Sequence, residues 1–368
     1  MSYITAIGTA SPPNKFSQST IADFMTRSMQ LQGEDERKLR TLFRATGIET
    51  RHSVLDDYGK QEGFDFYSNT KNLEPFPSTK RRLDVFRQHA LSLSLAAVSS
   101  CMIRAQEVDL NSLTHLIVVS CTGMYAPGLD IDIVKSLKLN STIHRTCINF
   151  MGCYAAFNAI KLADTFCRME SNAKVLVVST ELCTLHFQKM NTENNMLANA
   201  LFADGSAALL IESAPRKGLN IVPESFYCDL AYDGEQDMAW SIGDMGFQMQ
   251  LSSYVPEIIR NAIRKLTSSL LANISKQLSD ITFFAIHPGG KKILEVVEQE
   301  LGLSKEQNRF AYEVLRNFGN MSSPTVLFVL NELMKSLKGG DEGKKILSFA
   351  FGPGLTLESM VLKIENHQ

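Results

Sequence analysis

Strand-length apolar runs alternate with helical patterns along this chain, and the order of that alternation occurs twice. The first half contains VVSCTG, a helical segment, VLVVSTE and then GSAALLIE. The second half contains FAIHPGG, helical segments, ILSFAFGPG and then LTLESMVLKI. Runs that are apolar throughout are typical of strands covered on both faces. The pattern therefore predicts an α/β protein that is built from two similar halves.

The individual elements follow from the same patterns. Strands are predicted at residues 3–7, 115–120, 175–179, 207–211, 281–286, 346–350 and 359–364. Helices are predicted at residues 83–104, 155–169, 255–277, 293–301 and 323–337. The polar, aperiodic segment 57–80 is expected to be a long surface excursion or a cap.

Charge and cysteine content exclude several classes of protein. The 37 Lys and Arg residues nearly balance the 39 Asp and Glu residues, so no basic surplus indicates a nucleic acid or an anionic membrane as partner. The seven cysteines form no CxxC pair and no cluster with zinc spacing, and no metal site is predicted. The N-terminus lacks a secretory pattern, and the apolar runs are shorter than the ~20 residues of a membrane-spanning helix. We expect a cytoplasmic protein with free thiols and no membrane insertion.

Cys153 is the first candidate for a catalytic residue. It follows Gly152 and precedes a helical face of small and apolar residues, so we expect it at a helix N-terminus. Unpaired N–H groups and the helix dipole at this position favour a thiolate. A buried structural cysteine is the competing interpretation, because that is the commonest fate of a free cysteine.

Two further candidates come from the second half. His287 follows an apolar strand and precedes Pro-Gly-Gly, a place where α/β sheets carry functional groups, although a plain loop histidine fits as well. Asn320 precedes a strongly apolar helix, for which Ser322 or Ser323 suits the N-cap and Pro324 the first helical position. Helix capping alone would explain the serines and the proline, but it does not require the asparagine.

These motifs together resemble the type III polyketide synthases, the chalcone and stilbene synthase group. The resemblance rests on GCYAAFNA, IHPGG, FGNMSSPT and AFGPGLTLE, supported by CTGMYAPG, STEL and LFADGSAAL. They occur in the family's order over nearly the whole chain. The resemblance implies a thiolase fold, with two βαβαβαββ-type halves in five αβαβα layers and a homodimeric assembly. The N-terminal half would cover residues 1–215 and the C-terminal half residues 216–368.

The resemblance also implies a reaction. An acyl-CoA starter would load onto Cys153, and malonyl-CoA would extend it by decarboxylative Claisen condensation to a pyrone, resorcinol or phloroglucinol-type product. His287 as an imidazolium would favour the Cys153 thiolate, and His287 and Asn320 would stabilise the enolate. No cofactor is implied beyond the CoA thioester substrates. An acyl carrier protein as starter donor stays open.

Cavity residues are carried over from the family in the same way. Phe202 matches a gatekeeper, and Met249 stands where the family has a second gatekeeper that is usually Phe. Trp240 replaces a residue that is often small in plant members, although a core tryptophan is the alternative. These departures favour an aliphatic starter over the aromatic starters of plant enzymes. The other expected cavity residues are Cys121, Glu181, Cys183, His186, Ser322, Gly352 and Pro353.

Basic residues near the N-terminus are candidates for binding CoA phosphates. Arg37, Arg40 and Arg44 are spaced i, i+3, i+7 on one face of a predicted helix, in a region where the family places basic residues that contact CoA. A solvated charged helix is the alternative, and we favour the CoA contact. Lys292, shortly after HPGG, is a further candidate.

Three other interpretations stay open at this point. A β-ketoacyl-acyl-carrier-protein synthase III has the same fold and the same Cys, His and Asn. A papain-like protease uses these residue types in the same order, but the mid-chain position of Cys153 argues against it. A non-catalytic protein with the thiolase fold is the third.

Overall fold

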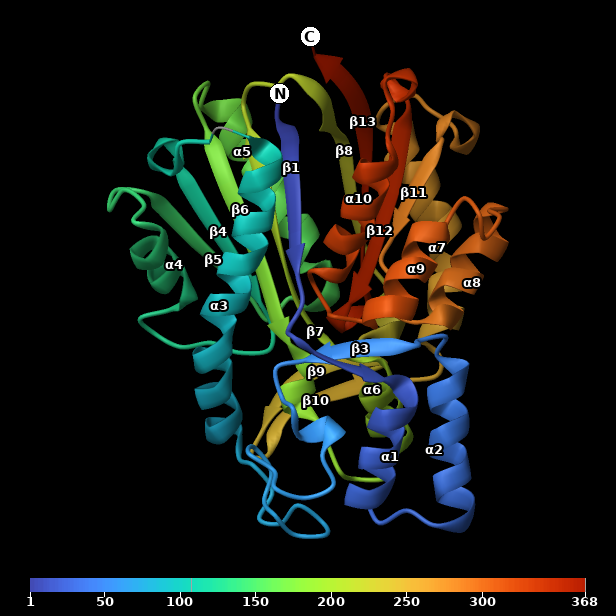
Figure 1. The fold of residues 1–368 in the computed structure, drawn as a ribbon. Helices are drawn as coiled ribbons and strands as arrows, with labels where there is room; N and C mark the ends of the chain where they lie inside the picture. The colour runs from blue at the N-terminus through green and yellow to red at the C-terminus, as the bar shows by residue number, and fades with distance from the viewer. Residues whose placement is uncertain (107, 368) are drawn as a thin grey trace.

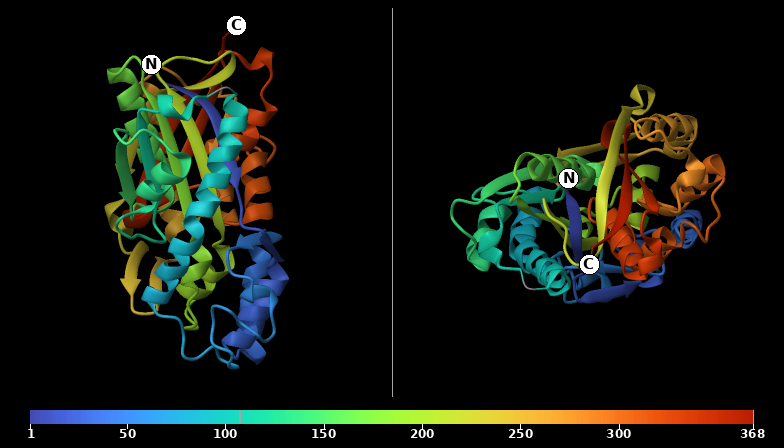
Figure 2. Two further views of the ribbon diagram at one scale, coloured as in Figure 1. Left: turned by 60° about the vertical axis from the view of Figure 1, so that its left-hand side comes forward. Right: turned by 90° about the horizontal axis from the view of Figure 1, so that it is seen from above.

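Strand β1 (Tyr3–Ala10) lies in the middle of a nine-stranded sheet in the computed structural model, which describes residues 1–106 and 108–367 (Figure 1). The strand order is β11-β12-β13-β8-β1-β7-β6-β4-β5. β1 pairs with β7 along its length, but it pairs with β8 only at Ile4 and Ile221. The sheet therefore has two parts that meet at β1 and β8, which lie side by side in the middle of the molecule (Figure 2).

The first half follows the expected βαβαβαββ order. After β1 it continues with α3 (Thr79–Ala105), β4 (His115–Ser120), α4 (Leu129–Leu137), β5 (His144–Asn149), α5 (Ala155–Met169), β6 (Lys174–Leu182) and β7 (Asp204–Glu212). The sequence patterns missed β5 because this edge strand is largely exposed and carries no apolar run.

The second half repeats the order with one difference. It contains β8 (Gly218–Leu230), α7 (Val255–Ala272), β11 (Phe283–Ile286), α8 (Lys291–Leu301), α9 (Arg309–Phe318), α10 (Thr325–Ser336), β12 (Lys345–Gly352) and β13 (Thr356–His367). Between α8 and α10 the described chain forms α9 and no counterpart of β5. β7 ends at Glu212 and β8 begins at Gly218. The expected boundary between the halves, after residue 215, falls between these two strands and stays a prediction.

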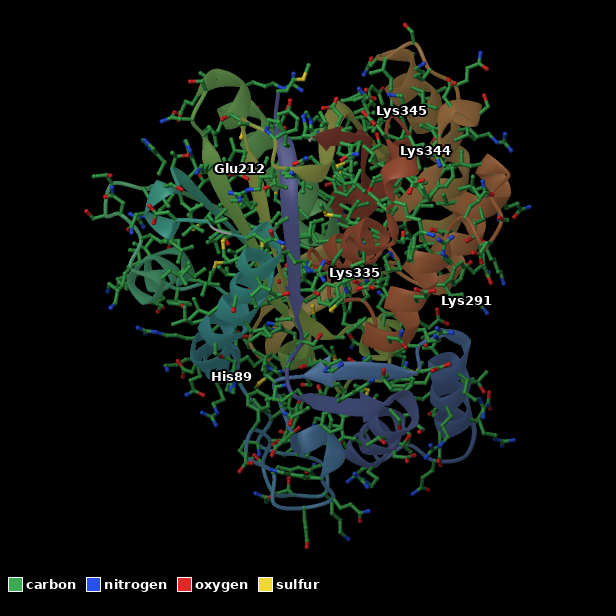
Figure 3. All side chains as sticks on the ribbon, turned by 45° about the horizontal axis from the view of Figure 1, so that its top comes forward. His89, Glu212, Lys291, Lys335, Lys344 and Lys345 are labelled. Atoms are coloured by element: carbon green, nitrogen blue, oxygen red, sulfur yellow. The ribbon has the colours of Figure 1, made fainter. Side chains whose placement is uncertain are left out.

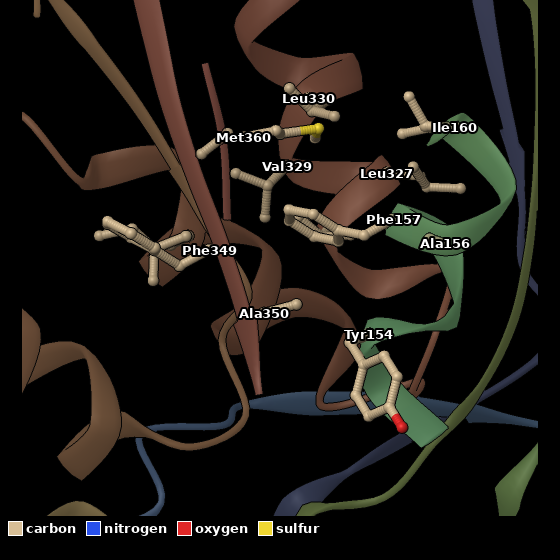
Figure 4. Close-up of a cluster of buried hydrophobic side chains, with 14 of the residues drawn as sticks. Tyr154, Ala156, Phe157, Ile160, Leu327, Val329, Leu330, Phe349, Ala350 and Met360 are labelled. Carbon is tan, nitrogen blue, oxygen red and sulfur yellow. The ribbon is translucent and has the colours of Figure 1, made fainter. Parts of the chain in front are cut away.

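The helices form the outer and central layers of the expected five-layer thiolase fold. α3 packs on β1, β6 and β7, and α7 packs on β8 and β13. Between the two parts of the sheet, α5 contacts strands of both halves, and so does α10. Figure 4 shows the side chains of this central layer, where Phe157 of α5 lies near Val329 and Leu330 of α10. Burial of these apolar faces fixes the position of both helix N-termini, which carry the candidate residues.

Smaller elements gather at one end of the sheet (Figure 1). They are β2 (Asn14–Ser17), α1 (Gln18–Ser28), α2 (Gly33–Ala45), β3 (Thr50–Ser53), α6 (Glu193–Leu201), β9 (Met238–Gly243) and β10 (Gly246–Leu251). The segment 57–80 is a cap on this end. Its Asp57 carboxylate accepts three backbone N–H groups, each at 2.9 Å, and Phe66 and Tyr67 are buried.

No helix in the described part of the chain is both long and apolar enough to cross a membrane.

Candidate active site

Cys153 lies on a single 3-10 turn, Gly152–Tyr154, that leads directly into α5. Gly152 has a φ of +74°, which a glycine adopts without strain, and this places the turn at the N-terminus of the helix as expected. The thiol is buried, and burial raises its pKa to about 11, although side-chain hydrogen bonds with Ser322 and Asn320 act to lower it. The resting side chain is therefore a thiol. Desolvation thus outweighs these contacts and opposes the thiolate that the sequence leads us to expect at this position.

His287 follows β11 directly, and its backbone N–H donates to the Phe349 carbonyl at 2.8 Å. The imidazole is buried, and neither ring nitrogen has a hydrogen-bond partner among the described residues. Burial lowers its pKa to about 3, so the ring is neutral at physiological pH. The expected imidazolium is thus corrected to a neutral imidazole, which can both accept and donate a proton.

Asn320 is held by backbone pairing between two segments. Its N–H donates to the Leu201 carbonyl at 2.9 Å, and its carbonyl accepts from Ala203 N–H at 2.9 Å. The side-chain Oδ1 accepts the Ser322 N–H at 2.8 Å, and Nδ2 donates to the Gly289 carbonyl at 3.2 Å. Since Gly289 is two residues after His287, this bond ties the amide to the histidine turn and fixes the orientation of Nδ2.

The serines beside Asn320 do not cap α10. The helix begins at Thr325 with Pro324 at the N-cap position, and no side-chain cap forms. Ser323 instead donates to Glu181 Oε1 at 2.6 Å. The expected N-cap role of the serines is therefore wrong, because the helix begins later than expected and Pro324 occupies the N-cap position.

A cavity opens at Cys153. Its lining includes seven of the expected cavity residues, and Thr122, Gly152 and Met238 complete it. The seven are Cys121, Cys183, Phe202, Trp240, Met249, Ser322 and Pro353. Gly352 lies behind this lining, where a Cβ would come within 2.6 Å of the Tyr154 ring. Neither His287 nor Asn320 is part of this lining. Asn320 contacts Cys153 directly, and its bond to the Gly289 carbonyl links it to the turn that follows His287.

Glu181 lies beneath this cavity rather than in its wall. Its carboxylate accepts Ser323 Oγ at 2.6 Å, Thr122 Oγ1 at 2.7 Å and Cys121 N–H at 2.9 Å. Burial raises its pKa, and these donors oppose that effect. The hydrogen bonds between this carboxylate and its neighbours hold the Cys121 turn in place.

Trp240 forms a wall of the cavity and is not simply a core residue. Its Nε1–H donates to the Cys121 carbonyl at 2.8 Å. It packs edge-on against His186 and Phe247, whose rings stack on each other with centroids 4.2 Å apart. His186 accepts the Phe247 N–H at Nδ1 and therefore donates from Nε2 to the Thr122 carbonyl, which identifies a neutral ring. His186 lines an adjoining cavity together with Trp240.

The basic candidates differ in their surroundings. Arg40 pairs with Glu36 and Asp23, so its charge is already balanced. Arg37 and Arg44 are exposed on α2, and Lys292 is exposed on α8. Lys291, which the sequence did not single out, packs over Gly47 where α8 approaches the end of α2 (Figure 3).

Sequence reasoning also missed Arg51. This buried arginine on β3 donates to the Phe202 carbonyl at 2.7 Å and to the Asn199 carbonyl at 2.8 Å. Nothing in the short polar stretch TRHS indicates a buried cation, since its partners come from distant segments.

Comparison with known proteins decides the family. The model of the N-terminal domain of chalcone and stilbene synthases matches residues 1–215, and the model of their C-terminal domain matches residues 228–365. The chain belongs to the chalcone and stilbene synthase family. It is a type III polyketide synthase, which is an acyl-CoA-dependent condensing enzyme and therefore a transferase. The synthase III-like, protease-like and non-catalytic interpretations are not favoured.

Individual relatives of this synthase cover nearly the whole chain. The Mycobacterium tuberculosis protein "Alpha-pyrone synthesis polyketide synthase-like Pks18" is 32% identical, over 99% of this chain and 91% of its own. The structure of PKS-I from the brown alga Ectocarpus siliculosus has a TM-score of 0.90 and 26% identity, over 98% of both chains. The type III polyketide synthase domain of Steely1 from Dictyostelium has a TM-score of 0.89 and 28% identity, over 98% of this chain and 99% of that domain.

Proposed function

We propose that Cys153 is the residue to which the starter acyl group is transferred. The observation that carries this is its buried thiol, in contact with the Asn320 amide, at the base of a cavity. In the loading step His287 accepts the thiol proton while the sulfur attacks the thioester carbonyl of an acyl-CoA. The bond between the acyl carbon and the CoA sulfur then breaks, and the proton passes from His287 to the CoA thiolate. Only the neutral form of the imidazole can accept this proton.

In the extension step we propose that His287 and Asn320 act as hydrogen-bond donors. The thioester oxygen of malonyl-CoA would accept from His287 and from Asn320 Nδ2. The bond to the carboxylate breaks, CO2 leaves, and the electron pair forms an enolate that these donors stabilise. The enolate carbon attacks the acyl carbonyl on Cys153 and forms the new carbon–carbon bond. The bond from the acyl carbon to the cysteine sulfur breaks, and the resulting thiolate takes a proton from solvent water. No step requires a metal or a redox cofactor.

We further propose an aliphatic starter and a pyrone-type product. Trp240 takes up space in the wall of the cavity at Cys153, and the stacked His186 and Phe247 pack against its ring from the adjoining cavity. The Glu181 carboxylate already accepts hydrogen bonds from four donors, so it is poorly placed to act as a base in ring closure. The name of the mycobacterial relative, which refers to alpha-pyrone synthesis, supports a lactone over a resorcinol or phloroglucinol. The candidates for contacts with the CoA phosphates are Arg37, Arg44, Lys291 and Lys292. An acyl carrier protein, in place of CoA, as the donor of the starter acyl group is a variant of this proposal that can be tested in the same way.

The assembly we propose is a homodimer in a reducing compartment such as the cytoplasm. β5 is an edge strand whose outer side has no pairing partner within the described chain, and such edges favour pairing with a second copy. All seven cysteines have free thiols. If the β5 strands of two protomers meet about a two-fold axis, oxidation should cross-link exposed Cys147 to the partner copy, and Cys147→Ser should abolish the cross-link.

The deciding experiment is mass spectrometry of the protein with malonyl-CoA and a panel of acyl-CoAs, beside Cys153→Ala. We expect a Cys153-linked acyl adduct and a pyrone product, and both should be absent with Cys153→Ala. Cys121→Ala, which removes another thiol of the same cavity, should keep the adduct and is the matched control. An adduct that persists in Cys153→Ala would refute the assignment, and preferential turnover of coumaroyl-CoA would refute the aliphatic starter.

A further inference from the structure

Ser322 has a left-handed backbone conformation, which favours glycine. Its φ is +59°, and within the described part of the chain it is the one residue other than glycine that has a positive φ and also lines the cavity at Cys153. Such a conformation costs free energy in a residue with a Cβ, and it persists only where the surroundings enforce it. Because strained residues of this kind gather at functional sites, the strain points to a function for Ser322.

Three hydrogen bonds hold the Ser322 backbone in this conformation. Its N–H donates to Asn320 Oδ1 at 2.8 Å. Its carbonyl accepts from Thr325 Oγ1 at 2.8 Å and from the Thr325 N–H at 3.1 Å. Since Asn320 Nδ2 donates to the Gly289 carbonyl at 3.2 Å, one amide side chain fixes both the histidine turn and Ser322. The backbone therefore sets the direction of the Ser322 side chain before any substrate binds.

The two neighbouring serines use their hydroxyls differently. Ser323 donates to Glu181 Oε1 at 2.6 Å and is not part of the cavity lining. Ser322 lines the cavity, and its side chain is in hydrogen-bonding contact with Cys153. Of the contacts that lower the pKa of Cys153, the one with Ser322 is the largest, and the one with Asn320 is smaller. A hydroxyl that donates to sulfur in this way favours the thiolate over the thiol.

The Cys153 sulfur has little other support for a negative charge. Burial opposes that charge, and the nearby Glu181 carboxylate acts in the same direction. His287 is neutral and brings no positive charge to offset them. Hydrogen-bond donors that are fixed in advance stabilise a charge that forms in such an environment. The strain at Ser322 is thus explained if it holds one of these donors in place.

We propose that Ser322 is a catalytic residue that donates a hydrogen bond to the Cys153 sulfur whenever that sulfur carries negative charge. In the loading step, His287 takes the thiol proton, and the Ser322 hydroxyl stabilises the charge that develops on sulfur. In the condensation, the bond between the acyl carbon and the sulfur breaks and its electron pair stays on sulfur. Ser322 stabilises this leaving thiolate until it takes a proton from water, and keeps its own proton throughout. This role rests on the proposed function, because it requires Cys153 to carry the acyl group.

Two substitutions separate the hydroxyl from the strain. Ser322→Gly removes the hydroxyl and relieves the positive φ, whereas Ser322→Ala removes the hydroxyl and keeps the strain. Alkylation of Cys153 by iodoacetamide at about pH 8, followed by peptide mapping, measures the reactivity of the sulfur without any CoA substrate. We expect the rate in both variants to fall about 3-fold or more. Loss of a hydrogen bond to a charged group lowers the thiolate fraction about 10-fold, and the greater nucleophilicity of the remaining thiolate offsets about half of this on a logarithmic scale.

Ser275→Gly is the matched control, since Ser275 has a φ of +52° but is exposed and outside the cavity lining. It should leave the alkylation rate unchanged, and thermal unfolding checks that each variant is folded. An undiminished rate in Ser322→Gly would overturn the proposal, even if the rate falls in Ser322→Ala, because the effect would then come from strain and not from the hydroxyl. Should Ser322→Ala not fold, the rate in Ser322→Gly decides.

Acyl loading separates this proposal from the proposed function. We expect Ser322→Gly to form the acyl adduct on Cys153 more slowly, in parallel with its slower alkylation. Slower alkylation of Ser322→Gly, with no acyl adduct on Cys153 of the unmodified protein, would keep the hydrogen bond and reject the acyl transfer. An acyl adduct on Cys153 together with undiminished alkylation of Ser322→Gly would do the reverse.

Discussion

Gly152 of the first half lies so close to Pro353 of the second half that a Cβ on Gly152 would come within 2.2 Å of Pro353 Cδ. Gly152 also has a φ of +74°, so the position excludes other residues both by conformation and by space. The contact joins the turn that carries Cys153 to the end of β12. It explains how a nucleophile on one half is positioned against residues of the other.

Gly152→Ala should therefore destabilise the protein and impair acyl loading together. The positive φ costs about 1 kcal/mol in an alanine, and the clash with Pro353 adds about 1 to 3 kcal/mol. Thermal unfolding and the rate of Cys153 acylation measure both effects. Gly218→Ala is the matched control, since Gly218 has a φ of +94° but nothing within 4 Å of its Cβ position. An equal loss of stability in the two variants would show that the Pro353 contact is unimportant.

The pKa of Cys153, raised to about 11 by burial, predicts a steep pH dependence of its reactivity. Below that pKa the thiolate fraction rises about tenfold per pH unit, so alkylation by iodoacetamide should do the same between pH 7 and 9. Peptide mapping separates Cys153 from the exposed Cys147 and Cys228. Asn320→Ala removes a contact that lowers the pKa and should slow alkylation at every pH in this range. A rate that is flat from pH 6 to 9 would instead indicate a preformed thiolate.

Much of this site could be predicted from local sequence. Small and apolar residues at helical spacing predict helix α5 at its observed bounds and the turn at Cys153 just before it. His287 was correctly placed at the end of its strand, because an apolar run followed by Pro-Gly-Gly is a local signal. Such features depend on neighbours in the chain, which the sequence displays directly.

Features that depend on distant partners could not be predicted in this way. The neutral state of His287 comes from burial by both halves, which no local pattern reports. Ser323 looked like a helix cap, but its hydroxyl bonds to Glu181, 142 residues away. Arg51 has partners on α1 and after α6, so its short strand gave no indication of a buried cation.

Ser323→Ala should reduce stability because it leaves a buried carboxylate with one donor fewer. Ser323 Oγ donates to Glu181 Oε1 at 2.6 Å, and loss of such a bond to a charged group costs about 1 to 3 kcal/mol. Chemical denaturation measures the change. Ser268→Ala removes an exposed hydroxyl that bonds to the Lys265 carbonyl and should be neutral. A neutral Ser323→Ala would mean that the Ser120 and Thr122 hydroxyls and the Cys121 N–H suffice to hold Glu181.

His186 should make the stability of the protein depend on pH. Burial lowers its pKa to about 3 from the ordinary value of 6.5, so the unfolded chain binds a proton more readily than the folded protein. The contribution of His186 to the free energy of unfolding is at its maximum above pH 6.5. It falls by about 1.4 kcal/mol per pH unit below that, until about pH 3. Because other buried groups titrate in the same range, the test compares the free energy of unfolding of the unmodified protein with that of a variant that lacks this imidazole. His186→Gln does not titrate there, so the advantage of the unmodified protein over this variant should shrink by about 1.4 kcal/mol between about pH 5.5 and 4.5. Unfolding in urea at both pH values measures it, and an advantage that stays constant would show that His186 has an ordinary pKa in the folded protein.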